Sequence, residues 1–245
     1  MRKTITGFFA FICFSVFALT ATQAKDLKGW GVVVMHGKGG QPGSMSSVSA
    51  ALTAAGASVV TPTMSWSNGY RTYSATLDEV AGHIASLRAK GATRIALVGQ
   101  SLGANVALGY GAQRGDVQAI VAMAPGHFPE RFASKSAASL ARAKQAVAAG
   151  RGNEVGSYYD TNQGKEFEIR TTAAAYASFF DPDGPAVMSR NAANLKVRNL
   201  LWIVGTEDAG ARSVAKGGKV VSIPGGHFDM PKVSAPEVVA WLQSL

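Results

Sequence analysis

Short apolar runs alternate with longer segments of helical periodicity along most of the chain. The runs with the length and apolar character of buried strands are residues 30–35, 57–60, 94–98, 117–123, 199–204 and 219–223. The segments with apolar side chains at helical spacing are residues 46–55, 74–89, 102–113 and 235–245. This alternation predicts an α/β fold with a mostly parallel sheet and helices on both faces.

The alternation stops between residues 126 and 195. Residues 131–149 form an Ala-rich pattern that predicts a long helix, residues 152–165 are polar and rich in turn formers, and residues 171–180 predict a short helix. Because this segment follows a strand of the predicted sheet, it is either a cap or lid over a site or a set of ordinary crossover helices.

The first 24 residues have the pattern of a secretory signal peptide. Arg2 and Lys3 precede an apolar run over residues 7–19, and small residues up to Ala24 offer a cleavage site. The alternative is an uncleaved anchor helix. The chain's single cysteine, Cys13, lies in this segment, so the mature domain, residues 25–245, would contain no disulfide. We therefore expect a secreted or periplasmic protein.

The charge balance narrows the possible partners. Removing Arg2 and Lys3 lowers the formal charge from +9 to +7, and the remaining basic residues are scattered and do not cluster with aromatic residues. This distribution argues against nucleic acid as a partner. A weak contact with an anionic envelope surface and simple solubility both remain compatible with it, and the oligomeric state is left open.

Residues 99–103, Gly-Gln-Ser-Leu-Gly, join the apolar run 94–98 to the predicted helix 102–113. A serine at such a strand–turn–helix apex is held in a strained conformation with its hydroxyl above the sheet edge. Glycines on both sides avoid a clash with the neighbouring strand and helix. Ser101 is therefore the candidate nucleophile.

A serine nucleophile needs a base, and the base needs an orienting carboxylate. Among the four histidines, His227 follows the last predicted strand and can reach a serine at the same sheet edge, whereas His83 lies within a predicted helix. The acid is expected after run 199–204. Asp208 is favoured there over its neighbour Glu207, because a Gly-x-x-Asp turn returns toward the strand end.

Glycines after the first strand suggest an anion-binding loop. Residues 36–40 read His-Gly-Lys-Gly-Gly, and they lack the spacing of a nucleotide-binding loop. The backbone N–H groups of Lys38 and Leu102 could together stabilise a tetrahedral oxyanion. A generic glycine loop that binds phosphate is the alternative.

Together these motifs resemble the α/β-hydrolase superfamily, and most closely its small bacterial esterase and dienelactone-hydrolase-like branch, with Ser101 where a cysteine is common in the latter. The resemblance implies a serine hydrolase that forms an acyl-enzyme on a small ester and requires no metal or cofactor. The alternatives are a peptidase or amidase and a catalytically silent binding protein of the envelope. Trp66, Tyr70 and His127 are candidate substrate-binding residues; Trp66 and Tyr70 could equally be packing residues.

Overall fold

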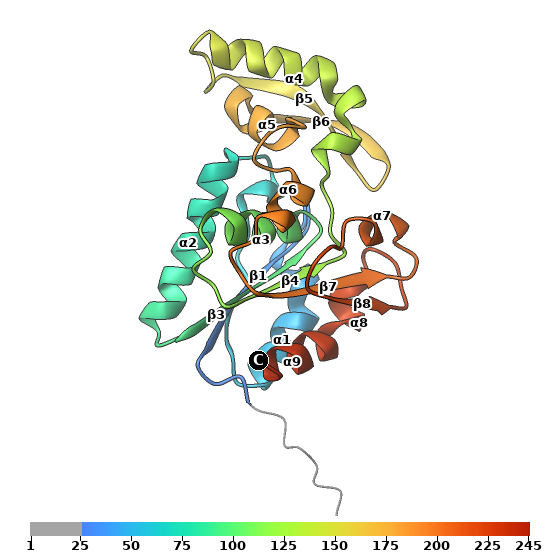
Figure 1. Cartoon of the computed structure of the whole chain (residues 1–245). Helices are drawn as coiled ribbons and strands as arrows, with labels where there is room; N and C mark the ends of the chain where they lie inside the picture. Colours follow the sequence, from blue (N-terminus) through green and yellow to red (C-terminus); the bar gives the residue numbers. More distant parts are fainter. Residues whose placement is uncertain (1–25) are drawn as a thin grey trace, which may run out of the picture.

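A computed structural model describes residues 26–245 of the chain (Figure 1), so the predicted signal peptide and Cys13 lie outside the described residues. Six parallel strands form one sheet in the order β2-β1-β3-β4-β7-β8. Their bounds are β1 Trp30–Met35, β2 Ser58–Val60, β3 Arg94–Gln100, β4 Ala119–Met123, β7 Asn199–Gly205 and β8 Lys219–Ile223. The predicted parallel α/β fold is confirmed.

Helices cover both faces of this sheet (Figure 1). The helices on one face are α1 Ser46–Ala54, α8 Met230–Val233 and α9 Ala235–Gln243, and those on the other are α2 Tyr73–Ala89, α3 Leu102–Gln113 and α6 Met188–Ala193. The short helix α7, Ala209–Arg212, follows β7. No helix within residues 26–245 is long and apolar enough to cross a bilayer.

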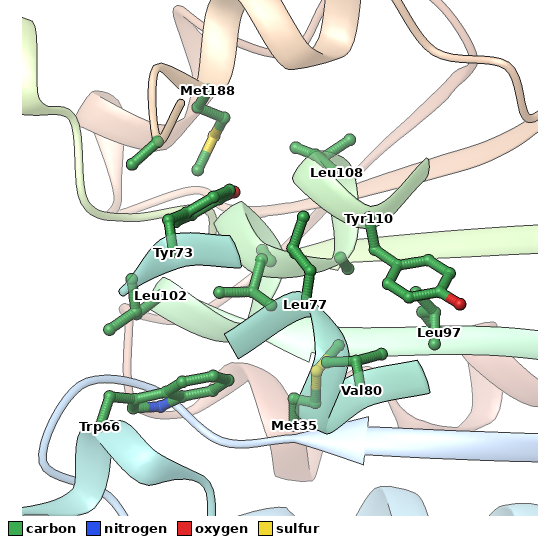
Figure 2. Close-up of a cluster of buried hydrophobic side chains, with 14 of the residues drawn as sticks. Met35, Trp66, Tyr73, Leu77, Val80, Leu97, Leu102, Leu108, Tyr110 and Met188 are labelled. Atoms are coloured by element: carbon green, nitrogen blue, oxygen red, sulfur yellow. The ribbon is translucent and has the colours of Figure 1, made fainter. Parts of the chain in front are cut away.

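Alternating residues of each central strand point into two separate cores. In β1, Val33 and Met35 belong to the core on the α2–α3 face, whereas Val32 and Val34 belong to the core under α1 and α9. This is the period of two that a pleated strand imposes. Figure 2 shows part of the first core, where buried side chains of α2 and α3 pack against the sheet. Burial on both faces explains why these strands read as continuous apolar runs.

Residues 133–180 form a separate layer, called here the inserted layer, beyond the helices of the sheet (Figure 1). It contains α4 Ala133–Ala148, the hairpin of β5 Val155–Asn162 and β6 Lys165–Thr172, and α5 Ala173–Phe180. Tyr176 of α5 stacks between two rings, with centroids 4.6 Å from Tyr158 and 4.3 Å from Phe180. These rings are continuous with the core on the α2–α3 face of the sheet, so the layer is packed onto the domain through aromatic side chains.

The expectation of a turn-rich loop over residues 152–165 is wrong, because β5 and the start of β6 occupy most of it. The two strands are joined by Gln163 and Gly164, whose φ angles are 48° and 79°. Positive φ at both central residues is the geometry of a tight hairpin turn that matches the twist of the strands. The polar side chains of this segment lie on an antiparallel hairpin that is partly exposed.

Candidate active site

Ser101 stands at the turn between β3 and α3 with φ 58° and ψ −116°. This left-handed conformation is uncommon for a residue with a side chain and is the strain that the sequence predicts. A Cβ atom on Gly99 would lie 2.1 Å from the carbonyl oxygen of Gly103, and one on Gly103 would lie 2.6 Å from that of Met35. Both glycines are therefore required by the close approach of backbone segments.

His227 and Asp208 meet at the same edge of the sheet. His227 follows β8, Asp208 follows β7, and His227 Nδ1 lies 2.6 Å from Asp208 Oδ2. Both side chains are mostly buried, whereas neighbouring Glu207 is exposed. The Gln100 amide also donates to the carbonyl of His227 at 3.3 Å. With Nδ1 facing the carboxylate, Nε2 is the ring nitrogen left to exchange a proton with another group.

Ser101 and His227 both line two cavities. The larger, of about 320 Å³, is also lined by Lys38, Leu102, His127 and Asp208, together with Pro125, Gly126, Phe128, Phe132, Thr161, Asn162, Gln163, Gly164, Gly210 and Ala211. The smaller, of about 80 Å³, extends past Gln100 and Phe228. Within the described part of the chain, no hydrogen bond joins the Ser101 hydroxyl to the His227 ring. Such contacts often tighten only when substrate binds.

Hydrogen bonds from buried groups hold the start of the loop after β1 in place. Met64 N–H donates to His36 Nε2 at 3.1 Å, so His36 carries its proton on Nδ1, which lies 2.8 Å from the carbonyl oxygen of Gly37. Burial lowers the pKa of His36, which favours this neutral ring. Trp66 Nε1 donates to the carbonyls of His36 and Gly37, at 3.1 Å each.

Two backbone N–H groups near Ser101 are candidate donors to an oxyanion. Among residues 26–245, the N–H groups of Lys38 and Leu102 have no hydrogen-bond partner. Leu102 is the first residue of α3, where N–H groups have no partner within the helix. Lys38 and Leu102, which the sequence suggested as the oxyanion donors, both line the larger cavity together with Ser101.

The structure places Trp66 and Tyr70 away from the positions that the sequence suggested. Neither is among the described residues that line the two cavities at Ser101. Both side chains are buried. Trp66 supports the loop after β1 through its ring N–H, and the Tyr70 hydroxyl donates to Asp160 Oδ2 at 2.8 Å. Their polar atoms bond to protein groups, so they stabilise the wall of the site from behind.

His127 does line the larger cavity, and it is held there in an unusual state. Its φ is 68°, and its Nε2 lies 2.8 Å from the carbonyl oxygen of Phe179. Burial among aromatic rings, with a smaller effect of the Lys38 charge, lowers its pKa to about 3. His127 is therefore a neutral donor to that carbonyl, and a ring with so low a pKa is a poor general base near pH 7.

Sequence reasoning missed Asp160, which lies on β5. Its side chain is fully buried, and its Oδ1 is 2.5 Å from Lys38 Nζ. The alternating pattern on either side of Gln163 and Gly164 is the signal that could have placed it on a hairpin. No group of three or more His, Cys, Asp or Glu residues in the described chain is arranged to hold a metal ion.

Comparison with known proteins agrees with this fold. The model of the alpha/beta hydrolase family matches residues 32–240. A monoacylglycerol lipase from Paleococcus ferrophilus superposes with a TM-score of 0.63 at 20% identity, covering 87% of this chain and 94% of that one. A soluble variant of monoglyceride lipase from Saccharomyces cerevisiae, in complex with a substrate analog, gives 0.59 at 11% identity, covering 90% and 88%. A comparison with curated protein sequences gave no match.

The order of the strands, the serine turn and the histidine after β8 define a hydrolase-type α/β architecture. The chain belongs to the alpha/beta hydrolase family.

Proposed function

We propose that this protein is a serine hydrolase that cleaves small carboxylic esters through Ser101, His227 and Asp208. The proposal is carried by the 2.6 Å contact between His227 Nδ1 and Asp208 Oδ2, made in a cavity that Ser101 also lines. A carboxylate on Nδ1 selects the tautomer that presents Nε2 to a serine and stabilises the imidazolium formed during reaction. Family membership and the lipases among the similar structures support the same chemistry.

In the proposed reaction, Ser101 Oγ attacks the acyl carbon while its proton passes to His227 Nε2. The carbonyl oxygen becomes an anion that accepts hydrogen bonds from the N–H groups of Lys38 and Leu102. Each such donor typically stabilises the transition state by about 3 kcal/mol. The bond to the alcohol oxygen then breaks, and the alcohol leaves with the proton from His227. Water then gives a proton to Nε2 and adds to the acyl carbon. The bond between that carbon and Ser101 Oγ breaks, Oγ takes the proton back from Nε2, and the acid leaves with both residues restored.

The cavity suggests the class of ester. Its lining combines apolar side chains, those of Pro125, Phe128 and Phe132, with the polar Asn162 and Gln163 at the tip of the hairpin. About 320 Å³ is small for a long acyl chain with a bulky alcohol. We therefore propose an ester with a short or medium acyl group.

The test combines labelling with a panel of substrates. A fluorophosphonate probe should label the wild-type protein and leave Ser101→Ala unlabelled. Among p-nitrophenyl esters of graded length, kcat/KM should be highest for short or medium chains. Faster cleavage of matched anilides than of esters would indicate an amidase. A folded wild-type protein that is neither labelled nor active on any of these would indicate a silent binding protein.

We also propose that the protein is exported and that its first 24 residues are removed. The basic start and the apolar run of residues 7–19 support this. N-terminal sequencing of the protein from the cell envelope or culture medium should begin at Lys25. A start at Met1 would instead indicate an uncleaved anchor or retention inside the cell.

A further inference from the structure

A carboxylate of the inserted layer holds the ammonium of Lys38 inside the protein. Lys38 Nζ lies 2.5 Å from Asp160 Oδ1 and donates to the carbonyl of Thr161 at 2.9 Å. The two charged side chains are 7% and 0% exposed. They connect the loop after β1 with strand β5, although 122 positions separate them in the sequence.

The carboxylate of Asp160 is itself fixed in orientation. The Tyr70 hydroxyl donates to its Oδ2 at 2.8 Å, and the Thr161 N–H donates to its Oδ1 at 2.6 Å. The side-chain amide of Asn162 adds a longer contact, 3.4 Å, to the backbone carbonyl of Lys38. The hairpin therefore contacts Lys38 at both its side chain and its backbone.

A pair of this kind defines geometry more than it adds stability. Removing two charges from water is costly, and their attraction recovers that cost only when the contact is well formed. An exposed pair such as Lys135–Glu166, which joins α4 to β6 within the inserted layer, contributes little by comparison. A buried pair that crosses from the inserted layer to the loop after β1 penalises every arrangement in which the two parts move apart.

We propose that Asp160 is a positioning residue for the oxyanion-binding loop. Through the Lys38 ammonium it fixes the backbone of Lys38, so that the Lys38 N–H faces the cavity next to Ser101. This inference rests on the proposed function, in which that N–H stabilises the tetrahedral intermediate. The inserted layer is then part of the reaction site and not a lid that opens in each turnover.

The experiment compares Lys38→Met and Asp160→Asn with wild type on the best p-nitrophenyl ester. Both variants keep the backbone N–H at position 38, so any effect acts through its position. We expect kcat to fall at least tenfold while KM changes less than threefold, because a misplaced donor weakens the transition state more than the bound substrate. Affinity for a trifluoromethyl ketone, which forms an oxyanion on Ser101, should fall by a similar factor. Lys135→Met, which removes the exposed α4 lysine that pairs with Glu166 of the hairpin, should behave as wild type.

If a single variant does not fold, the double variant Lys38→Met/Asp160→Asn is used to test the proposal. It leaves no buried charge without a partner, so we expect it to unfold cooperatively near the wild-type temperature, with kcat still at least tenfold low. Wild-type kcat in any folded variant without the ion pair would overturn the proposal, as would an equal loss in Lys135→Met. A double variant that does not fold would assign the contact to folding alone and would also overturn it. Failure of the proposed function is distinguishable, because the wild-type protein would then show no hydrolysis that depends on Ser101.

Discussion

His227 Nδ1 and Asp208 Oδ2 are 2.6 Å apart, although they belong to loops that follow different strands. The reason is the register of the sheet, in which Gly205 at the end of β7 is paired with Ile223 at the end of β8. Both loops therefore start at the same height of the sheet edge. The fold thus determines which of two adjacent acids meets the ring.

Asp208→Asn should lower kcat by roughly 10³- to 10⁴-fold, because the amide cannot stabilise the imidazolium and can favour the wrong tautomer. Glu207→Gln is the matched control and should stay within twofold of wild type, since its side chain is exposed. Steady-state rates on one short ester are sufficient for the comparison. A larger loss in the Glu207 variant would move the acid to that position.

Ser101→Ala and His227→Ala should each reduce kcat by several orders of magnitude, and the double variant should be little worse than either single one. The serine and the histidine act in the same proton transfer, so removing either one already removes the contribution of the other to the rate. His83→Ala, on α2 and away from both cavities, should keep wild-type activity. Strictly additive losses would show that the serine and the histidine do not act as a unit.

Gly99→Ala should destabilise the protein by about 3 kcal/mol, because the new methyl would lie 2.1 Å from the carbonyl oxygen of Gly103. Gly82→Ala is the control. It lies within α2 with no atom near the added methyl, and it should stabilise by about 0.5 to 1 kcal/mol. Urea unfolding of both variants measures the difference. Similar stabilities would mean that the serine turn relaxes freely.

His127 should make the stability of the protein depend on pH. Its pKa is lowered by burial from 6.5 to about 3, so between these values the unfolded chain binds a proton that the folded protein does not. Stability is therefore fully retained above pH 6.5 and falls as the pH drops toward 3, by up to about 1.4 kcal/mol per pH unit. His127→Asn tolerates the positive φ and does not titrate in this range, so its unfolding free energy between pH 6 and 4 should fall less steeply. Parallel curves for the two proteins would contradict the assignment.

Much of the fold could be predicted because its signals are local. The strand Trp30–Met35 and the helix Leu102–Gln113 occur with the predicted bounds, since a strand buried on both faces and a helix after a glycine turn are readable within a few residues. The hairpin Val155–Thr172 was not predicted, because its polar, partly exposed strands resemble a loop. Helices α6 and α8 are only six and four residues long, too short for a periodic pattern to be recognised.

The residues of the site likewise fall into those that local sequence signals could place and those that only the packed structure shows. Ser101, Asp208 and His227 could be placed because each follows a predicted strand, and parallel strands end at one edge of a sheet. Asp160 could not, because its partner Lys38 is 122 positions away and only the packed structure brings them together. Trp66 and Tyr70 were left open between substrate binding and packing for a related reason, since the sequence does not show whether an aromatic ring faces a cavity or packs behind its wall.

The chain leaves the sheet after β4 and returns at β7, and these two strands are neighbours, with Ala119 paired to Asn199. The segment between them crosses from the carboxyl end of β4 back to the amino end of β7, as a connection between parallel neighbours must. It is a cassette in the sense that another crossover of the same span can replace it without reordering the strands or moving the loops that carry Ser101, Asp208 and His227. The buried lysine at position 38 limits which replacements succeed. A transplanted segment would have to bring a carboxylate to the same place, or the lysine would have to be replaced together with it. Lineages that diversified by swapping this cassette should therefore have changed both positions together.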